Sequence, residues 1–169
     1  MYRGSHLPAL MKLVPMTTGP ILEMGCGMFS TPFLHWTCYQ TGRRLVTYES
    51  DPKYFNDVLT GVQENLRNAH QEFHTVGLVT DWDAVDLSPA WSIAFVDHSP
   101  DRRRYLDLKR LTHAEYVVVH DTEPRRNNWR KHHWGEAFGL FKYRFQYDKA
   151  LPETTILSNV HDVAGFTIP

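Results

Sequence analysis

Five short apolar runs alternate with longer polar or amphipathic segments over the first two thirds of the chain. The runs expected to form strands are residues 20–24, 44–49, 72–79, 92–97 and 115–120. Strands that are apolar on both faces and separated by helical stretches form parallel sheets covered by helices on both sides. The pattern therefore predicts an α/β fold.

Two of the intervening segments have the apolar spacing of helices. Residues 53–68 follow Asp51-Pro52, which pairs a capping residue with a proline suited to the first turn. A second helix is expected after Ser99-Pro100. Residues 80–90 are short and rich in turn formers, so they leave room for only a brief helix.

The last third of the chain changes to a period of two. Residues 141–148 alternate aromatic and polar side chains, and residues 153–160 follow across a short turn containing Pro152. Two such strands joined by a short loop form an antiparallel hairpin. We see no linker or repeat, and expect a single domain, 1–169. Its expected parts are an N-terminal helical segment (1–19), βα units (20–121) and a basic, aromatic loop or helix with the hairpin (122–169).

Composition and charge narrow the class of protein. The 169 residues are 42% hydrophobic and 22% charged, as in globular domains, and the net charge of -1 predicts no general attraction to nucleic acid or to anionic membranes. A local basic patch would not show in that sum. No apolar run reaches the roughly 18 residues of a membrane span. The N-terminus lacks the pattern of a signal peptide, and Cys26 and Cys38 cannot form a disulfide scaffold. We expect a cytoplasmic protein with reduced thiols.

The first strand runs into a Gly25-x-Gly27 turn and then a helix that begins near Ser30 and Thr31. Ligands of doubly wound sheets bind at the carboxyl ends of the strands, and glycines let the backbone approach a ligand closely. The two hydroxyls could cap the helix or bind the ligand. Taken alone, the simpler interpretation is a tight strand-to-helix turn.

Glu49 strengthens the prediction of a cofactor site. It ends the second strand, where a carboxylate can accept hydrogen bonds from both ribose hydroxyls. Its alternative role is an exposed acid at a helix start. Ribose recognition fits nicotinamide dinucleotides and S-adenosylmethionine equally, but Ser30 replaces the third fingerprint glycine, and Glu23 suits a cationic amino-acid group. A closing hairpin also leaves no expected substrate domain, so S-adenosyl-L-methionine is favoured.

The sequence resembles the successive motifs of class I S-adenosylmethionine-dependent methyltransferases from residue 21 onward. The segments are ILEMGCGMFST, LVTYESD, SIAFVDHSPDRRRYLDL, EYVVVHDTE and FKYRFQYDKALPETTILSNV. The resemblance implies a Rossmann-like, doubly wound mixed sheet of seven strands in the order 3-2-1-4-5-7-6, with strand 7 antiparallel.

The resemblance also implies roles for individual residues. Glu23, Gly25 and Gly27 would surround the methionine part of the cofactor, and Glu49 would hold the ribose. Further expected cofactor contacts are Cys26, Ser30, Thr31, Ser50, Asp97 and His98. After strand three, Asp81 would accept the adenine amine while Trp82 lies against the base. The alternative is a surface turn with Trp82 packed on the sheet edge.

Asp97 ends the fourth strand and His120-Asp121 end the fifth, so these candidate catalytic residues converge at one sheet edge. Methyl transfer requires a positioned nucleophile and, for a hydroxyl or amine, removal of its proton. A histidine of near-neutral pKa suits that step, and the base would be His120 or Asp121. Helix capping is the alternative role of both carboxylates.

The segment FVDHSPDRRRYL also resembles catechol O-methyltransferase-type enzymes, which bind magnesium through an Asp and a later Asp-Asn pair. The matching positions here are Asp97 and Asp121-Thr122, with His98 beside the adenine. The family's catalytic lysine falls on Pro100. Two carboxylates could still hold Mg2+, but the lost asparagine disfavours a metal. If one is bound, Asp97 and Asp121 are its expected ligands.

Residues 122–136 concentrate basic side chains with two tryptophans, which could hold an anionic or sugar-like substrate or stack on a base. A solvated helix with tryptophans packed on the hairpin is slightly favoured. Residues 102–104, three arginines, are expected on an exposed helix face.

The leading hypothesis is a methyltransferase acting on a small molecule, with a hydroxyl as the expected acceptor. The alternatives are a macromolecular substrate, a non-catalytic S-adenosylmethionine-binding module and, remotely, a nicotinamide oxidoreductase. Only about 20 residues precede the first strand, so a homo-oligomer could supply a missing wall of the cleft. Neither a membrane nor nucleic acid is an expected partner.

Overall fold

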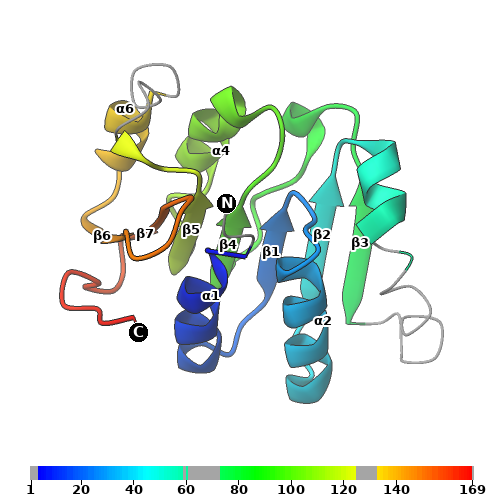
Figure 1. Ribbon diagram of the computed structural model, residues 1–169, viewed down its shortest axis with the longest axis horizontal. Coiled ribbons are helices and arrows are strands. Elements are labelled where there is room, and N and C mark those ends of the chain that lie inside the picture. The colour runs from blue at the N-terminus through cyan, green and yellow to red at the C-terminus, as the bar shows by residue number, and fades with distance from the viewer. Residues whose placement is uncertain (1–3, 59, 61–72, 125–132, 169) are drawn as a thin grey trace.

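A seven-stranded sheet forms the centre of the protein, shown in a computed structural model that describes residues 4–58, 60, 73–124 and 133–168 (Figure 1). The strand order is β3-β2-β1-β4-β5-β7-β6, and β7 runs antiparallel to both of its neighbours. The predicted fold class and strand order are confirmed. The strands are β1 (Ile21–Met24), β2 (Leu45–Glu49), β3 (His74–Leu78), β4 (Ile93–Val96), β5 (Tyr116–His120), β6 (Tyr143–Tyr147) and β7 (Thr154–Ser158).

Strand register brings the ends of the three central strands together. Met24, the last residue of β1, pairs with Tyr48 on β2 and with Val96 on β4. The backbone N–H of Gly25 then donates to the carbonyl of Tyr48 over 2.8 Å, and that of Asp97 donates to Met24 over 2.8 Å. The residues that follow these strands therefore leave the sheet at one edge, where ligands of such sheets bind.

Helices cover both faces of the sheet (Figure 1). Alternate strand residues face opposite sides, so Ile21 packs in the apolar cluster of α1 and α2 while Leu22 packs in that of α4 and α6. This two-sided burial explains the continuous apolar runs of the sequence. The helical elements are α1 (Leu7–Leu13), η1 (Val14–Met16), α2 (Ser30–Thr41), η2 (Trp82–Ala84), η3 (Asp101–Arg103), α4 (Arg104–Arg110) and α6 (Trp134–Phe138).

The predicted helices occur close to their expected places. Residues 52–58 are helical, as expected from Asp51-Pro52, and the stretch 61–68 of that prediction lies outside the described residues. The short 3-10 helix η2 is the brief helix expected between strands three and four. In the part of the chain that the structure describes, no helix has the length and apolarity needed to cross a bilayer.

Candidate active site at the carboxyl ends of the strands

A cavity of about 600 Å³ lies where β1, β2, β4 and β5 end; we call it the strand-end cavity. The amino-terminal segment closes one side through Gly4 and His6, and Pro152 from the β6–β7 turn adds to the same wall. The residues that line it and carry the sequence predictions are Cys26, Gly27, Glu49, Asp97, His120 and Asp121. These six residues end or follow four different strands, so only the fold brings them together.

The glycine turn packs closely against the end of β4. Gly25 has a φ of +94°, and a Cβ at this position would lie 2.6 Å from the backbone nitrogen of His98. A side chain at Gly27 would meet the Ser30 hydroxyl at 2.8 Å. The first glycine is therefore required by its own neighbours in the protein.

Glu49 is buried at the end of β2, and its carboxylate is held by backbone donors. Oε1 accepts hydrogen bonds from the N–H groups of Ser50 at 2.6 Å and Asp51 at 2.9 Å, and Oε2 accepts from Cys26 at 3.1 Å. The Cys26 bond ties the carboxylate directly to the glycine turn. Oε1 already accepts two hydrogen bonds, whereas Oε2 accepts one and has a second lone pair for a hydrogen bond from a ligand.

Glu23 lies fully buried beneath the turn, on the α2 side of the sheet. Its Oε2 accepts hydrogen bonds from the hydroxyls of Thr47 at 2.8 Å and Thr31 at 3.0 Å. Burial raises the pKa of Glu23 to about 7, although these hydroxyl donors partly oppose the rise. A chain of polar contacts continues from Thr47 to His74 at 2.9 Å and on to His35 at 3.0 Å.

Asp97 and His120 form a hydrogen-bonded pair across the ends of β4 and β5. Nδ1 of His120 lies 3.2 Å from the Asp97 carboxylate, and Nε2 lies 2.9 Å from the hydroxyl of Ser5. Burial alone would lower the pKa of His120, but the bond to Asp97 and its charge outweigh burial, so the pKa is raised above its usual value. Burial likewise opposes ionisation of Asp97, yet the His120 bond and the Arg104 charge keep its pKa low.

His6 is a member of this site that the sequence analysis missed. Its side chain is buried, with 5% of its surface exposed, and neither ring nitrogen has a hydrogen-bond partner. The ring lies 4.9 Å from that of Phe95 and 4.7 Å from that of His120. Burial, helped by the positive charge of His120, lowers the pKa of His6 to about 4. Nothing in the local sequence around residue 6 signals this contact.

Arg104 corrects the expectation that residues 102–104 lie on an exposed helix face. Its side chain is buried, and Nε and Nη1 donate to the carbonyls of His98 and His120 at 2.8 and 2.9 Å. Nη1 lies 3.1 Å from the carboxylate of Asp121, and Nη2 lies 3.0 Å from that of Asp97. Arg104 thus occupies the space between the two carboxylates because the first turn of α4 faces the ends of β4 and β5.

Asp121 has a strained backbone at the edge of the cavity. Its φ of +60° is rare for a residue with a side chain, although aspartate tolerates it better than most. The following Thr122 is buried and donates to the carbonyl of Glu153 at 3.3 Å. Thr122 stands where catechol O-methyltransferase-type enzymes carry their asparagine ligand, and its hydroxyl here binds the backbone just before β7.

The predicted adenine contacts lie at the start of η2, where Asp81 precedes the helix and Trp82 is its first residue. Asp81 caps this short helix by accepting from the Asp83 N–H at 2.9 Å. The Trp82 ring is buried and stacks on His98, with a centroid distance of 4.2 Å. His98 in turn lies 3.0 Å from the buried carboxylate of Asp107. His98 covers one face of the Trp82 ring, and the adenine contact of Trp82 stays a prediction.

Most of the basic and aromatic segment, residues 125–132, lies outside the described residues. Trp134, at the start of α6, is buried and stacks on Phe138 with a centroid distance of 5.3 Å. This tryptophan therefore belongs to the apolar cluster on the α4 side of the sheet.

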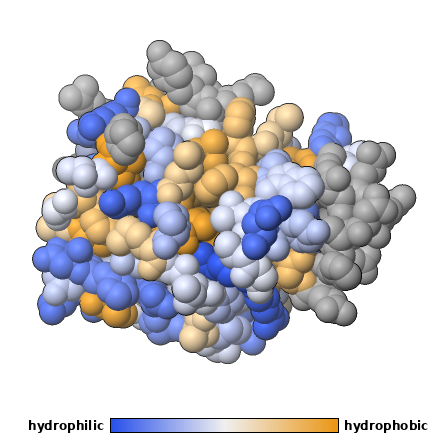
Figure 2. Space-filling view, turned by 90° about the horizontal axis from the view of Figure 1, so that it is seen from below, coloured by the Kyte–Doolittle hydropathy of each residue, from blue (hydrophilic) through white to orange (hydrophobic). Residues whose placement is uncertain are grey.

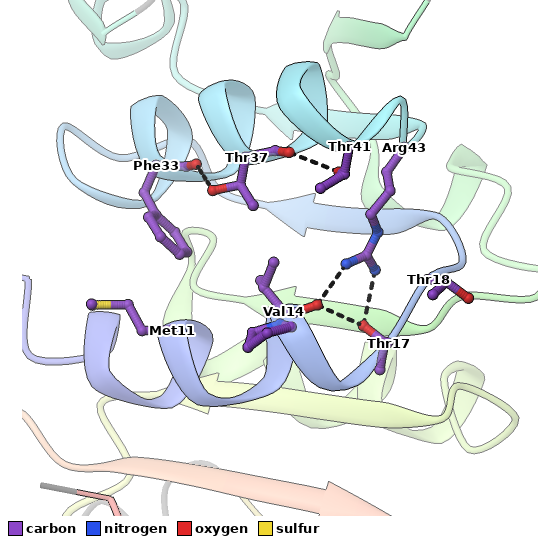
Figure 3. Close-up of a pocket in the computed structure, with 9 residues that line it drawn as sticks. Met11, Val14, Thr17, Thr18, Phe33, Thr37, Thr41 and Arg43 are labelled. Atoms are coloured by element: carbon purple, nitrogen blue, oxygen red, sulfur yellow. Dashed lines mark hydrogen bonds between the residues drawn. The ribbon is translucent and has the colours of Figure 1, made fainter.

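A second hollow, of about 470 Å³, lies between α1, η1 and α2 near the amino ends of β1 and β2 (Figure 3). Arg43 lies at one end of it and donates to the carbonyls of Gly19 and Val14 and to the Thr17 hydroxyl, each at 2.9 Å. These bonds hold η1 against the end of α2.

Figure 2, which views the molecule from below, shows apolar side chains interspersed with hydrophilic ones.

The protein is similar in structure to spermidine synthase from Thermotoga maritima, with a TM-score of 0.66 and 13% identity over 97% of this chain and 63% of that one. A proposed O-methyltransferase from Klebsiella pneumoniae has a TM-score of 0.60 and 18% identity over 94% of this chain and 80% of that one. A proposed tRNA methyltransferase from Streptococcus pneumoniae was solved with S-adenosyl-L-methionine. It has a TM-score of 0.56 and 14% identity over 93% of this chain and 75% of that one. No protein-family model and no curated protein matches the sequence.

These similarities, together with the strand order, define the class of the fold. The chain has the Rossmann-like fold of class I S-adenosylmethionine-dependent methyltransferases. It spans 63% of the length of the spermidine synthase, and the similar structures act on different kinds of acceptor. The fold therefore leaves the substrate to be argued from the site.

Proposed function

We propose that this protein is an S-adenosylmethionine-dependent methyltransferase that transfers a methyl group to a hydroxyl of a small molecule. The observation that carries the proposal is the position of Glu49. Its carboxylate is fixed to the glycine turn through Cys26 and lines the same cavity as Asp97 and His120. The proposed ribose-binding acid, the glycine turn and the proposed acid–base pair thus line one cavity.

The residues present fit the cofactor. Glu49 would accept hydrogen bonds from the ribose hydroxyls, and the turn from Gly25 to Gly27 would border the amino-acid part, with Glu23 beneath it. Ser50 and Asp81 remain proposed contacts for the nucleoside. The bound cofactor would supply an electrophilic methyl group on a sulfonium sulfur. The cavity is lined by four acids, Glu49, Asp51, Asp97 and Asp121, and their negative charge suits a ligand of positive charge.

The Asp97–His120 pair is the proposed proton acceptor for the methyl acceptor's hydroxyl. A proton that arrives on the imidazole is stabilised by the Asp97 carboxylate at 3.2 Å. Asp121 adds a second negative charge 3.7 Å from the same nitrogen. Arg104 occupies the space between Asp97 and Asp121, so these residues do not fit a magnesium ion bridging them, and the proposal uses none.

A small acceptor is favoured over a macromolecule by the wall that the amino-terminal segment builds. Gly4 and His6 line the cavity, and Ser5 lies within 2.9 Å of His120. The segment thereby encloses the space beside the proposed base. A non-catalytic binding module is the second candidate, because Pro100 stands where the resembled enzymes carry a lysine.

Calorimetry of the full chain with S-adenosylmethionine and S-adenosylhomocysteine tests the cofactor assignment. Replacing Glu49 by Gln should weaken both ligands by about 10- to 100-fold, the range expected for losing charge-assisted hydrogen bonds. Glu136→Gln, an exposed acid on α6, is the matched control and should bind like the wild type. Equal affinities of the Glu49 variant and the wild type would remove Glu49 from the site.

Turnover is tested separately with a labelled methyl donor and pools of small hydroxyl compounds, proteins and RNA. Label transfer confined to the small-molecule pool, and lost in His120→Ala, supports the proposal. Transfer to RNA or protein would show that the methyl acceptor is a macromolecule and would contradict the small-molecule proposal. Cofactor binding without transfer to any pool would favour the binding module.

A further inference from the structure

We propose that His6, Asp97 and His120 form a binding site for a divalent transition metal ion of the zinc type. One potential ligand atom from each residue lies within 4.8 Å of the other two. The three residues come from the segment before α1 and from the ends of β4 and β5. The site does not depend on methyl transfer and differs from the magnesium position between Asp97 and Asp121.

His6 lacks the hydrogen-bond partners that a buried imidazole needs. Both of its ring nitrogens are buried without a hydrogen-bond partner, although the side chain borders the strand-end cavity. A buried polar group without a partner costs free energy, and most such groups in native proteins have a ligand, a water or a protein partner. The ring lies edge-to-face with His120, at 4.7 Å between centroids. A metal ion would provide the missing partner.

Asp97 and His120 already have the spacing of two ligands of one ion. Nδ1 of His120 lies 3.2 Å from Oδ2 of Asp97. Two ligands bound at about 2.0–2.1 Å to one tetrahedral ion lie about 3.3–3.4 Å apart, so this pair is already at ligand spacing. Arg104 contacts Oδ1 of Asp97, which leaves Oδ2 for the ion. His6 would need to approach by at most about 1.4 Å to complete the set.

Ligand chemistry selects the kind of metal. Two imidazoles and one carboxylate suit Zn2+ and similar transition ions, whereas Mg2+ prefers oxygen ligands alone. The charge of Arg104 beside the site is balanced by Asp121, which lies 3.1 Å from it. Three protein ligands leave the fourth tetrahedral position of the ion open. Because His6, Asp97 and His120 all line the strand-end cavity, this position would face the cavity.

Metal binding would have three consequences for the protein. The ion replaces the proton that His120 shares with Asp97, and that proton goes to solvent; the base role of His120 proposed above applies to the metal-free protein. The ion would also tie the segment before α1 to the ends of β4 and β5. An acceptor hydroxyl at the open position would have its pKa lowered by the ion.

The test is titration of the untagged, chelator-treated full chain with Co2+, followed by its visible absorption, and with Zn2+ by calorimetry. We expect one ion per chain with the absorption of four-coordinate cobalt. His6→Ala and His6→Phe should each weaken binding by at least about 100-fold, since even outer-shell partners cost 10- to 100-fold. The phenylalanine variant keeps the packing on Phe95. His113→Ala, an exposed histidine, is the matched control.

Each result decides the proposal. Loss of binding in both folded His6 variants, with the His113 variant unchanged, supports it. Absence of one-to-one binding by the wild type, or equal binding by the His6 variants, overturns it. Glu49→Gln separates the two proposals, because it should weaken cofactor binding and leave metal binding unchanged. If the wild type binds the cofactor but no Co2+, only the metal site is refuted. If it binds Co2+ but no cofactor, only the cofactor assignment is refuted.

Discussion

Nη2 of Arg104 lies 3.0 Å from Oδ1 of Asp97, and the same nitrogen donates to the Asp97 backbone carbonyl at 2.9 Å. A single guanidinium therefore fixes both the backbone and the side chain at the end of β4. Through Nη1 it does the same for the end of β5, at His120 and Asp121. The positions of the candidate catalytic groups depend on this one buried cation.

Replacing Arg104 by Met should destabilise the protein by about 3–5 kcal/mol, because two carboxylates and three carbonyls lose their donor. Urea unfolding followed by circular dichroism measures this change. Arg102→Met, on the exposed side of η3, should stay within about 0.5 kcal/mol of the wild type. Similar stabilities of the two variants would show that Arg104 does not hold the strand ends together.

Gly25→Ala should cost about 3 kcal/mol or more, because the added Cβ would lie 2.6 Å from the backbone of His98. Gly42→Ala is the control, since Gly42 also has a positive φ, +65°, but has open space where its Cβ would be. It should cost only the backbone strain, about 1–2 kcal/mol. Thermal unfolding of the two variants separates contact from strain, and equal losses would contradict the close approach.

Glu23 should make the stability of the cofactor-free protein depend on pH. The carboxyl loses its proton near pH 4.5 when unfolded and near pH 7 when folded. Between these values the folded state binds more protons, so the free energy of unfolding falls as pH rises, by about 3 kcal/mol in total. Glu23→Gln lacks this loss, and its stability relative to the wild type should therefore rise from pH 4.5 to pH 8. Denaturant unfolding across this range measures the difference, and a flat difference would refute the raised pKa.

The imidazole of His120 should titrate above the usual histidine pKa of 6.5, because the protonated form is stabilised by Asp97. Asp97→Asn removes that charge and should lower the pKa of His120. NMR titration of the imidazole carbons in the metal-free protein measures both values. Asp162→Asn, a substitution outside the strand-end cavity, should leave the titration of His120 unchanged. An unshifted pKa in Asp97→Asn would contradict the pairing.

The sequence determined the sheet. Apolar runs buried on both faces, the Asp51-Pro52 helix start and the period-two hairpin are local signals, and each element formed where its local pattern placed it. The order of the strands followed from the resemblance of whole motifs. Gly25 and Glu49 could be chosen in advance because a turn and a strand end mark the carboxyl edge of a parallel sheet.

Only the tertiary structure decided what surrounds the proposed base. Arg104 sits in a run of three arginines that the sequence places on a solvated helix, whereas the docking of α4 buries Arg104 and leaves Arg102 exposed. His6 and Ser5 lie 114 and 115 residues before His120, so no local spacing connects them. Local periodicity reports which face of an element is buried. Contacts between elements depend on how the elements pack, and a single sequence carries no short-range signal for that.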